Sequence, residues 1–345
     1  MKLMHSLLAA AGAAVLAQGA LAADKLPAFN VDLAETSVSG LSSGAFMAVQ
    51  LQVAHSASIK GAGVVAGGPY YCAADNMMFT AICMGQVPFV TPNAALMVTA
   101  AKNFASQRKI DSLSNLAGRR VYVFSGFDDT VVKQPAVDAT VSFFTQAGVS
   151  GANLKYVNTV PAGHAVITPG FGNACSANAS PYISHCTVDG SGYDQAGELL
   201  KHIYGNLKDK AATPSGRMVT FDQRSFAPAS TAMAEQAYLY VPKSCEQGQS
   251  CKVHVAIHGC VQSAESVGDA FINNTGYNAW ADTNNMLVLY PQVNKSIVPT
   301  NPQGCWDWWG YTGVDYAVKS GAQITAIMKM VKALKAPAAA AAKDL

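Results

Sequence analysis

Short apolar runs alternate with helical patterns through the first 200 or so residues of this chain of 345. Residues 60–66 and 120–125 have the composition of buried strands, whereas residues 92–110 and 137–146 repeat apolar side chains at helical spacing. Strands that alternate with helices in this way form a parallel sheet with helices on both faces. The sequence therefore predicts an α/β fold with a mostly parallel central sheet.

The last third of the chain carries a second group of strand patterns. Residues 218–221 and 237–241 read as a pair of strands, and residues 252–257 and 286–290 are apolar runs of the buried type. Residues 316–331 are expected to form a closing helix.

The N-terminus has the pattern of a secretory signal peptide. A positive start at Lys2 precedes an apolar run over residues 7–16 and the small-residue site Ala20-Leu21-Ala22. The run is too short to span a bilayer comfortably. We therefore expect residues 1–22 to be removed and the mature protein to be secreted, extracellular or periplasmic, with no membrane segment. The Ala-rich tail, 336–345, is expected to be disordered.

Eight cysteines behind a signal peptide indicate disulfides, although their connectivity does not follow from sequence alone. The simplest pairing joins near neighbours and leaves one distant pair: Cys72–Cys83, Cys175–Cys186, Cys245–Cys251 and Cys260–Cys305. There is no Cys-x-x-Cys and no cluster of histidines at ligand spacing, so no metal is expected. Charged residues make up 13% of the chain and the net charge is +2, which gives no argument for a nucleic-acid partner.

The segment Gly40-Leu41-Ser42-Ser43-Gly44 has the Gly-x-Ser-x-Gly pattern of a nucleophile elbow. It lies between an extended stretch, 35–39, and a helical pattern, 45–55, which is the context that such an elbow requires. The motif is short enough to occur by chance. Its weight therefore depends on whether an acid and a base follow it.

Two later strand patterns end in suitable side chains. Residues 120–125 lead into Asp128 and Asp129, either of which could be the acid or could form an ordinary turn. The strand pattern at 153–160 leads into Gly163-His164, where a base is expected. The order Ser, Asp, His is that of α/β-hydrolases. The histidines in structural positions are His55, His185, His202 and His254.

A serine hydrolase also needs two N–H donors for the oxyanion, and one is expected from the amide of Ser43. The second fits the loop His258-Gly259-Cys260 after the strand at 252–257. In this sequence that loop comes after the candidate Ser, Asp and His, whereas in the usual α/β-hydrolase order it comes before them. A circularly permuted α/β-hydrolase fold with unchanged sheet neighbours reconciles the two orders, so we expect residues 23–335 to form a single catalytic domain.

Six blocks together resemble the polyhydroxybutyrate depolymerase family of esterases, and particularly its permuted, single-domain secreted members. The blocks are Ser39-Gly40-Leu41-Ser42-Ser43-Gly44, Ser125-Gly126-Phe127-Asp128-Asp129-Thr130-Val131-Val132, Gly163-His164, Ile257-His258-Gly259-Cys260-Val261-Gln262, Tyr290-Pro291-Gln292 and Gly304-Cys305-Trp306-Asp307-Trp308-Trp309. They cover most of the mature chain. The fourth and sixth blocks are specific, whereas the serine motif alone is not.

The resemblance implies a role for each matching residue. Ser42 is expected to be the nucleophile, Asp129 the acid and His164 the base, with the amides of Ser43 and Cys260 as the oxyanion hole. No metal or cofactor is implied.

The resemblance also implies a substrate crevice lined by tryptophan. A disulfide between Cys260 and Cys305 would bring Trp306 to the rim of the active site. We predict Trp306 and Trp308 as substrate-binding residues, although the sequence does not distinguish them from Trp309.

The implied activity is hydrolysis of poly(3-hydroxybutyrate), or of related short-chain polyhydroxyalkanoates and their oligomers, by a monomer that forms an acyl-enzyme. The sequence lacks the linker and separate substrate-binding domain of the larger extracellular members. Amorphous granules or soluble oligomers are therefore expected as substrates at least as much as crystalline polymer. The alternatives are a feruloyl or acetyl-xylan esterase, and a non-catalytic secreted binding protein on the same fold.

Overall fold

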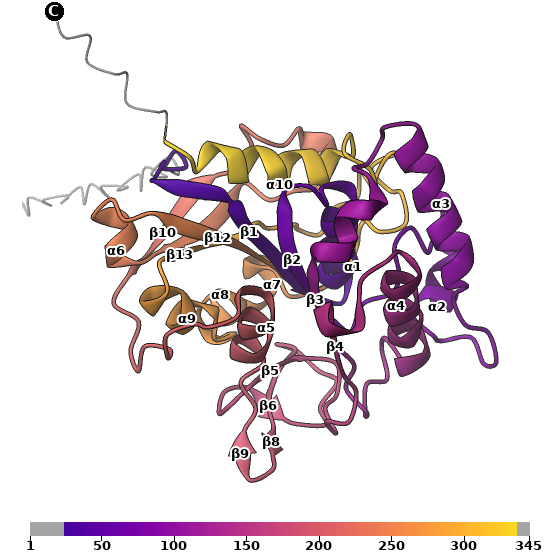
Figure 1. Cartoon of the computed structure of the whole chain (residues 1–345), viewed down its shortest axis with the longest axis horizontal. Coiled ribbons are helices and arrows are strands. Elements are labelled where there is room, and N and C mark those ends of the chain that lie inside the picture. Colours follow the sequence, from indigo (N-terminus) through magenta and orange to yellow (C-terminus); the bar gives the residue numbers. More distant parts are fainter. Residues whose placement is uncertain (1–23, 337–345) are drawn as a thin grey trace, which may run out of the picture.

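A computed structural model of the chain describes residues 24–336 (Figure 1). The expected signal peptide, 1–22, and the expected tail beyond residue 336 lie outside the described residues. Among the helices of residues 24–336, none is long and apolar enough to cross a membrane.

The core is an eight-stranded sheet with the order β10-β11-β13-β12-β1-β2-β3-β4. Seven of these strands run in the same direction, and β11 runs opposite to them. The strands are β1 (Val31–Leu41), β2 (Ile59–Val65), β3 (Arg120–Phe124), β4 (Leu154–Val157), β10 (Arg217–Asp222), β11 (Gln236–Val241), β12 (Cys251–Ile257) and β13 (Met286–Tyr290). Each expected strand is present, and the prediction of a mostly parallel α/β sheet is confirmed.

The sheet joins the two halves of the chain at β1. The register pairs Gly40 with Val64 of β2 on one side and with Ile257 of β12 on the other. Strands β10 to β13 follow β1 to β4 in the sequence, yet they form the other edge of the same sheet. This is the arrangement expected of a circularly permuted α/β-hydrolase fold, in which the early strands have moved to the end of the chain.

Helices cover both faces of the sheet, with α1 and α10 on one face and α5 and α9 on the other (Figure 1). The longer helices are α1 (Ser43–Ala54), α3 (Ala94–Ser106), α4 (Gln134–Gln146), α5 (Gln195–Tyr204), α9 (Tyr277–Thr283) and α10 (Ala322–Ala333). All twelve residues of α1 are buried, because this helix lies between the sheet and α10.

The closing helix begins later than the sequence predicts. We expected it from Tyr316, but α10 starts at Ala322. The intervening residues form turns, in which the amide of Val318 donates to Asp315 and that of Gly321 to Val318. These local bonds replace the helical ladder until Gly321 begins the helix.

An excursion between β4 and α5, residues 158–194, lies at the ends of β3 and β4 (Figure 1). Its small strands are β5 (Val166–Thr168), β6 (Asn173–Ala174), β7 (Ile183–His185), β8 (Thr187–Val188) and β9 (Ser191–Gly192). Other short helices are α2 (Thr80–Cys83), α6 (Lys243–Glu246), α7 (Ala264–Val267) and α8 (Ala270–Asn274). Turns of 3₁₀ helix occur at Met77–Phe79, Leu113–Gly118, Gly151–Asn153 and Ala229–Thr231.

All eight cysteines form disulfides, and the pairs are those that the spacing favours. Three bonds close short segments and one joins distant loops: Cys72–Cys83, Cys175–Cys186, Cys245–Cys251 and Cys260–Cys305. The long-range bond connects residues 45 apart, and the loops that it joins belong to the candidate active site.

Candidate active site

Ser42 occupies a strained turn between β1 and α1. Its backbone has φ 56° and ψ −123°, a conformation that side-chain-bearing residues adopt only under constraint. The constraint comes from the two flanking glycines. A Cβ on Gly40 would lie 2.3 Å from the carbonyl of Gly44, and one on Gly44 would lie 2.3 Å from the carbonyl oxygen of Ile257. Only glycine therefore fits on either side of the turn, which presents Ser42 beyond the end of β1.

The loops after β3 and β4 bring a carboxylate and an imidazole together. His164 Nδ1 lies 2.8 Å from Asp129 Oδ2, and both side chains are almost completely buried. The other oxygen, Asp129 Oδ1, accepts from the amides of Val131 and Val132 at 2.8 and 2.9 Å. Asp128 is half-buried and contributes its backbone to this region. Of the two candidate acids, the structure therefore places Asp129 against His164.

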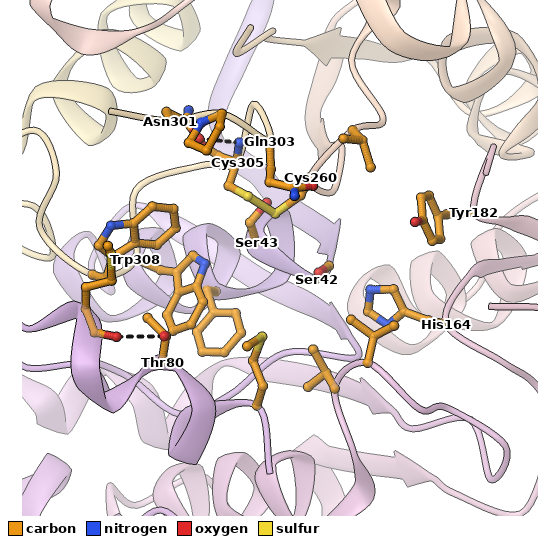
Figure 2. A pocket seen from close by; sticks show the side chains of 18 of the residues that line it. Ser42, Ser43, Thr80, His164, Tyr182, Cys260, Asn301, Gln303, Cys305 and Trp308 are labelled. Carbon is orange, nitrogen blue, oxygen red and sulfur yellow. Dashed lines mark hydrogen bonds between the residues drawn. A yellow bond between two sulfur atoms is a disulfide. The ribbon is translucent and has the colours of Figure 1, made fainter. Parts of the chain in front are cut away.

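Ser42 and His164 line the same cavity, and Figure 2 shows the imidazole facing the Ser42 hydroxyl. Asp129 occupies Nδ1 of His164, which leaves Nε2 as the nitrogen that can accept a proton. In residues 24–336 no hydrogen bond joins the Ser42 and His164 side chains. Bonds of this kind are often long in a free enzyme and tighten when substrate binds.

The loop after β12 is fixed by His258. The amide of Val293 donates to His258 Nε2 at 3.1 Å, so that nitrogen carries no hydrogen. The hydrogen of the neutral ring is therefore on Nδ1, which donates to the carbonyl of Gly259 at 2.7 Å. Burial lowers the pKa of His258 to about 4, and the ring is neutral near pH 7.

The hydrogen bond from His258 to the Gly259 carbonyl orients the backbone amide of Cys260. The Gly259–Cys260 peptide is trans, so its C=O and N–H point in opposite directions. Since His258 holds the carbonyl, the N–H of Cys260 turns the other way, and it donates to no acceptor within the described part of the chain. Ser43 is the first residue of α1, where an amide has no intrahelical acceptor. Both residues line the cavity beside Ser42.

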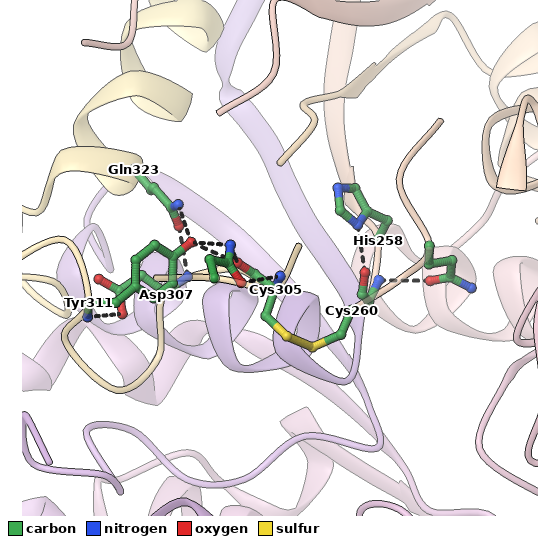
Figure 3. The surroundings of a disulfide bond; sticks show 9 residues. His258, Cys260, Cys305, Asp307, Tyr311 and Gln323 are labelled. Carbon is green, nitrogen blue, oxygen red and sulfur yellow. Dashed lines mark hydrogen bonds between the residues drawn. A yellow bond between two sulfur atoms is a disulfide. The ribbon is translucent and has the colours of Figure 1, made fainter. Parts of the chain in front are cut away.

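A disulfide anchors the same loop to the segment that carries the tryptophans (Figure 3). Beside the Cys260–Cys305 bond, the amide of Val261 donates to Gln303 at 2.7 Å. Val261 has φ 47°, a costly conformation for a β-branched residue. The disulfide and this hydrogen bond therefore hold the loop after β12 in a shape that it would not adopt alone.

Asp307 organises the tryptophan segment, and sequence reasoning missed it. Its buried carboxylate accepts from the amides of Gly310, Tyr311 and Thr312 at 2.7, 3.1 and 2.8 Å, and from the Thr312 hydroxyl at 2.6 Å. Burial raises the pKa of Asp307, although the hydrogen bonds oppose the rise. The only sequence signal was an aspartate among tryptophans.

The three clustered tryptophans take different positions. Trp308 stacks on Phe46 with 4.2 Å between ring centroids, and both Trp308 and Trp309 line the cavity. The expectation that Trp306 lies at the rim is wrong. Its side chain is fully buried in the main core, 5.5 Å from the His258 ring, and it does not line the cavity.

The cavity has a volume of about 490 Å³ and mostly apolar walls. Among the described residues, no Lys, Arg, Asp or Glu belongs to its lining. The lining residues are Ser42, Ser43, Phe46, Met77, Thr80, Met84, Val131, Val132, His164, Tyr182, Cys260, Val261, Thr300, Asn301, Pro302, Gln303, Cys305, Trp308 and Trp309. Such a site suits an uncharged, apolar substrate.

The other histidines expected to be structural lie away from the cavity lining. His254 is fully buried on β12, where its ring nitrogens meet the hydroxyls of Ser37 and Ser39 at 2.7 and 2.8 Å. Burial lowers the pKa of His254 to about 3, so it is a neutral part of the contact between β12 and β1.

The fold and this site define a serine hydrolase of the permuted α/β-hydrolase type. The chain is 46% identical over 332 residues to the poly(3-hydroxybutyrate) depolymerase of Delftia acidovorans and 42% identical over 327 residues to the polyhydroxybutyrate depolymerase of Talaromyces funiculosus. The chain belongs to the polyhydroxybutyrate depolymerase family. The aligned regions cover 94% and 90% of this chain, together with 65% of the Delftia protein and 93% of the Talaromyces protein.

Solved structures give the same relationship. A PHB depolymerase with a serine-to-alanine substitution, complexed with an R3HB trimer, matches with a TM-score of 0.81 at 40% identity. The PHB depolymerase of Penicillium funiculosum matches with a TM-score of 0.81 at 39% identity. Each match covers 90% of this chain and 98% of the other. No family model matches the chain.

Proposed function

We propose that Ser42, His164 and Asp129 form a catalytic triad that hydrolyses the ester bonds of poly(3-hydroxybutyrate), related short-chain polyhydroxyalkanoates and their oligomers. The observation that carries this proposal is the buried Asp129–His164 pair, 2.8 Å apart, beside an elbow serine in an uncharged cavity. The names of the relatives support the same substrate class.

The chemistry follows from the atoms at the site. Ser42 Oγ attacks the ester carbonyl as His164 Nε2 takes its proton, and the Asp129 carboxylate stabilises the imidazolium that forms. The amides of Ser43 and Cys260 stabilise the oxyanion. When the tetrahedral intermediate collapses, His164 returns the proton to the leaving alkoxide, which departs as a hydroxyl chain end. Water then attacks the acyl-Ser42 ester with the same assistance and releases a carboxylic acid.

The walls of the cavity support a polyester substrate. A polyhydroxyalkanoate chain has no charge, and charged side chains are likewise absent from the cavity lining. We assign Trp308 and Trp309, rather than Trp306, to contact with the chain. The R3HB trimer bound to a structural relative supports an extended site. A feruloyl or acetyl-xylan esterase is not favoured, because neither named relative belongs to those classes.

The proposed setting is outside the cytoplasm. Residues 1–22 would direct secretion, and residues 23–335 would act as one catalytic domain and as a monomer. Four disulfides support an oxidising compartment. Fractionation of the producing cells would find the protein in the medium or in the periplasm.

The test compares the wild-type protein with Ser42→Ala and with Ser150→Ala, which alters an exposed serine in the turn before β4. We expect wild type and Ser150→Ala to clear a suspension of amorphous poly(3-hydroxybutyrate) and to release 3-hydroxybutyrate and its oligomers. Ser42→Ala should do neither. Clearing by Ser42→Ala, or no clearing by wild type, would contradict the proposal.

A further inference from the structure

We infer that Asn178 is a positioning residue that holds the acid-bearing loop and the base-bearing loop in register. The inference rests on the proposed roles of Asp129 and His164. Asn178 lies in neither of their loops but further along the excursion, in the segment 175–186 that the Cys175–Cys186 disulfide closes.

The side-chain amide of Asn178 uses its full bonding capacity, which is two acceptor sites and two hydrogens. Oδ1 accepts from the amide of His164 at 2.9 Å and from that of Thr130 at 3.0 Å. Nδ2 donates to the carbonyls of Asp128 at 3.0 Å and Ser176 at 3.1 Å. Two of the partners, Asp128 and Thr130, therefore flank Asp129 in sequence. A third is the backbone amide of His164, the proposed base.

These contacts differ from those of an ordinary turn residue. An asparagine that only closes a turn bonds to its own neighbours. Of the four partners of Asn178, only Ser176 is local, whereas Thr130, His164 and Asp128 are 48, 14 and 50 residues away. The side chain therefore connects separate loops.

Backbone contacts bring Asn178 to this place. The amide of Gly163 donates to the carbonyl of Cys175 at 2.8 Å, so the loop that carries His164 lies directly against the segment 175–186. A Cβ on Gly163 would lie 2.3 Å from the carbonyl oxygen of Ala177. The glycine before the base thus permits the close approach on which the Asn178 bonds depend.

The bonds of Asn178 determine the geometry of the catalytic pair. Oδ1 of Asp129 is held by the amides of its own turn, which orient the carboxylate within that loop. They do not fix the distance of that loop from His164. Two backbone bonds between the loops, from the amide of Phe127 to Val160 at 2.8 Å and from that of Asp128 to Ala162 at 3.0 Å, and the side-chain amide of Asn178 do so. Without Asn178 the loops can shift, and displacement of catalytic groups by about 1 Å costs on the order of a hundredfold in rate.

The experiment compares Asn178→Ala and Asn178→Asp with wild type. Asn273→Ala is the matched control, since Asn273 is an exposed asparagine on α8 whose side chain bonds to Asp269 on the same helical segment and not to the loops of the site. The readouts are kcat and KM on p-nitrophenyl butyrate, the rate of Ser42 phosphonylation by a p-nitrophenyl phosphonate, and the downfield proton NMR signal of a His–Asp hydrogen bond.

For Asn178→Ala we expect kcat and the phosphonylation rate to fall about a hundredfold, with KM changed less than about threefold and the downfield signal lost or broadened. Asn178→Asp keeps an oxygen for the amides of His164 and Thr130, so it should recover part of the activity. Asn273→Ala should match wild type. A folded Asn178→Ala protein with kcat within about twofold of wild type would overturn the inference alone. A wild-type protein that neither turns over the ester nor is labelled at Ser42 would overturn the proposed function as well.

Discussion

The two sides of this active site are built differently. On the proposed acid–base side, Asp129 and His164 lie on the loops after β3 and β4, and hydrogen bonds rather than a disulfide join those loops. On the oxyanion side, the loop after β12 is tied by the Cys260–Cys305 disulfide and by the His258 ring. The proposed oxyanion donors would act by staying in place, which a covalent link favours. The proposed base would take and release a proton, which hydrogen-bonded loops can accommodate.

Gln262 connects the two sides. Its Oε1 accepts from the amide of Gly259 at 2.7 Å, and its Nε2 donates to the carbonyls of Pro181 and Tyr182 at 2.9 and 3.0 Å. The segment 175–186, which carries Asn178, therefore also contacts the loop after β12. This one irregular segment is in contact with both sides of the site, which come from different halves of the sequence.

The largest expected effect is on the acid–base side. Asp129→Asn should lower kcat by about 10⁴-fold, because the amide stabilises the wrong tautomer of His164 and cannot stabilise an imidazolium. Asp128→Asn should stay within a few-fold of wild type, since the backbone carbonyl of Asp128, not its side chain, bonds to Asn178. Steady-state kinetics on a soluble ester distinguish the two. Equal losses in both variants would contradict the assignment of the acid.

The next effect tests the oxyanion side. His258→Phe removes the hydrogen bond to the Gly259 carbonyl, so the Cys260 amide should no longer be held in its orientation. We expect kcat to fall by about 10²- to 10³-fold. His258→Asn can still donate from a position near that of Nδ1 and should lose less. KM should change little in both. If kcat of folded His258→Phe equals that of wild type, the ring does not position the oxyanion hole.

Removing one disulfide at a time tests what the covalent link at the site contributes to stability and to activity. Replacing Cys260 and Cys305 together by serine should lower the free energy of unfolding by about 4 kcal/mol, because the bond joins residues 45 apart. It should also lower kcat, by less than His258→Phe does. The same change at Cys245 and Cys251, 6 residues apart, should cost about 2 kcal/mol and leave kcat unchanged. Denaturant unfolding and kinetics measure both. If the Cys245/Cys251 variant also had a lowered kcat, the effect on activity would not be specific to the disulfide at the site.

The smallest expected effect is on the pH dependence of the folding stability. Burial lowers the pKa of His258 to about 4 and that of His254 to about 3, against about 6.5 in an unfolded chain. Between pH 6.5 and about 4 the unfolded state therefore binds more protons, and stability should fall as the pH falls. Chemical denaturation across this range should show a shallower slope for His254→Gln than for wild type. An identical slope would show that His254 is not held neutral by the fold.

Much of this arrangement can be predicted from sequence because the reactive residues follow predicted strands directly. Ser42, Asp129 and His164 lie after β1, β3 and β4, and the carboxyl ends of parallel strands meet at one edge of a sheet. The displaced His258-Gly259-Cys260 loop likewise predicts the permutation, because it follows β12, which pairs with β1.

The remainder depends on contacts that have no local signal. Asn178 lies in an irregular segment, and three of its four partners are backbone atoms of two other loops. Trp306 and Trp308 are two residues apart in one motif, yet Trp306 is buried in the core and Trp308 lines the cavity. Turns before Gly321 delay the start of α10, although the apolar pattern begins earlier.

The crystal structure of a phosphonate adduct tests the central claim most directly, because that claim is that the two ends of the sequence meet at one reacting group. We predict phosphorus bonded to Ser42 Oγ, with one phosphonyl oxygen roughly 2.7–3.1 Å from the amide nitrogens of both Ser43 and Cys260. His164 Nε2 should lie beside the leaving-group position. An adduct on another residue, or a phosphonyl oxygen that does not contact Cys260, would contradict this account.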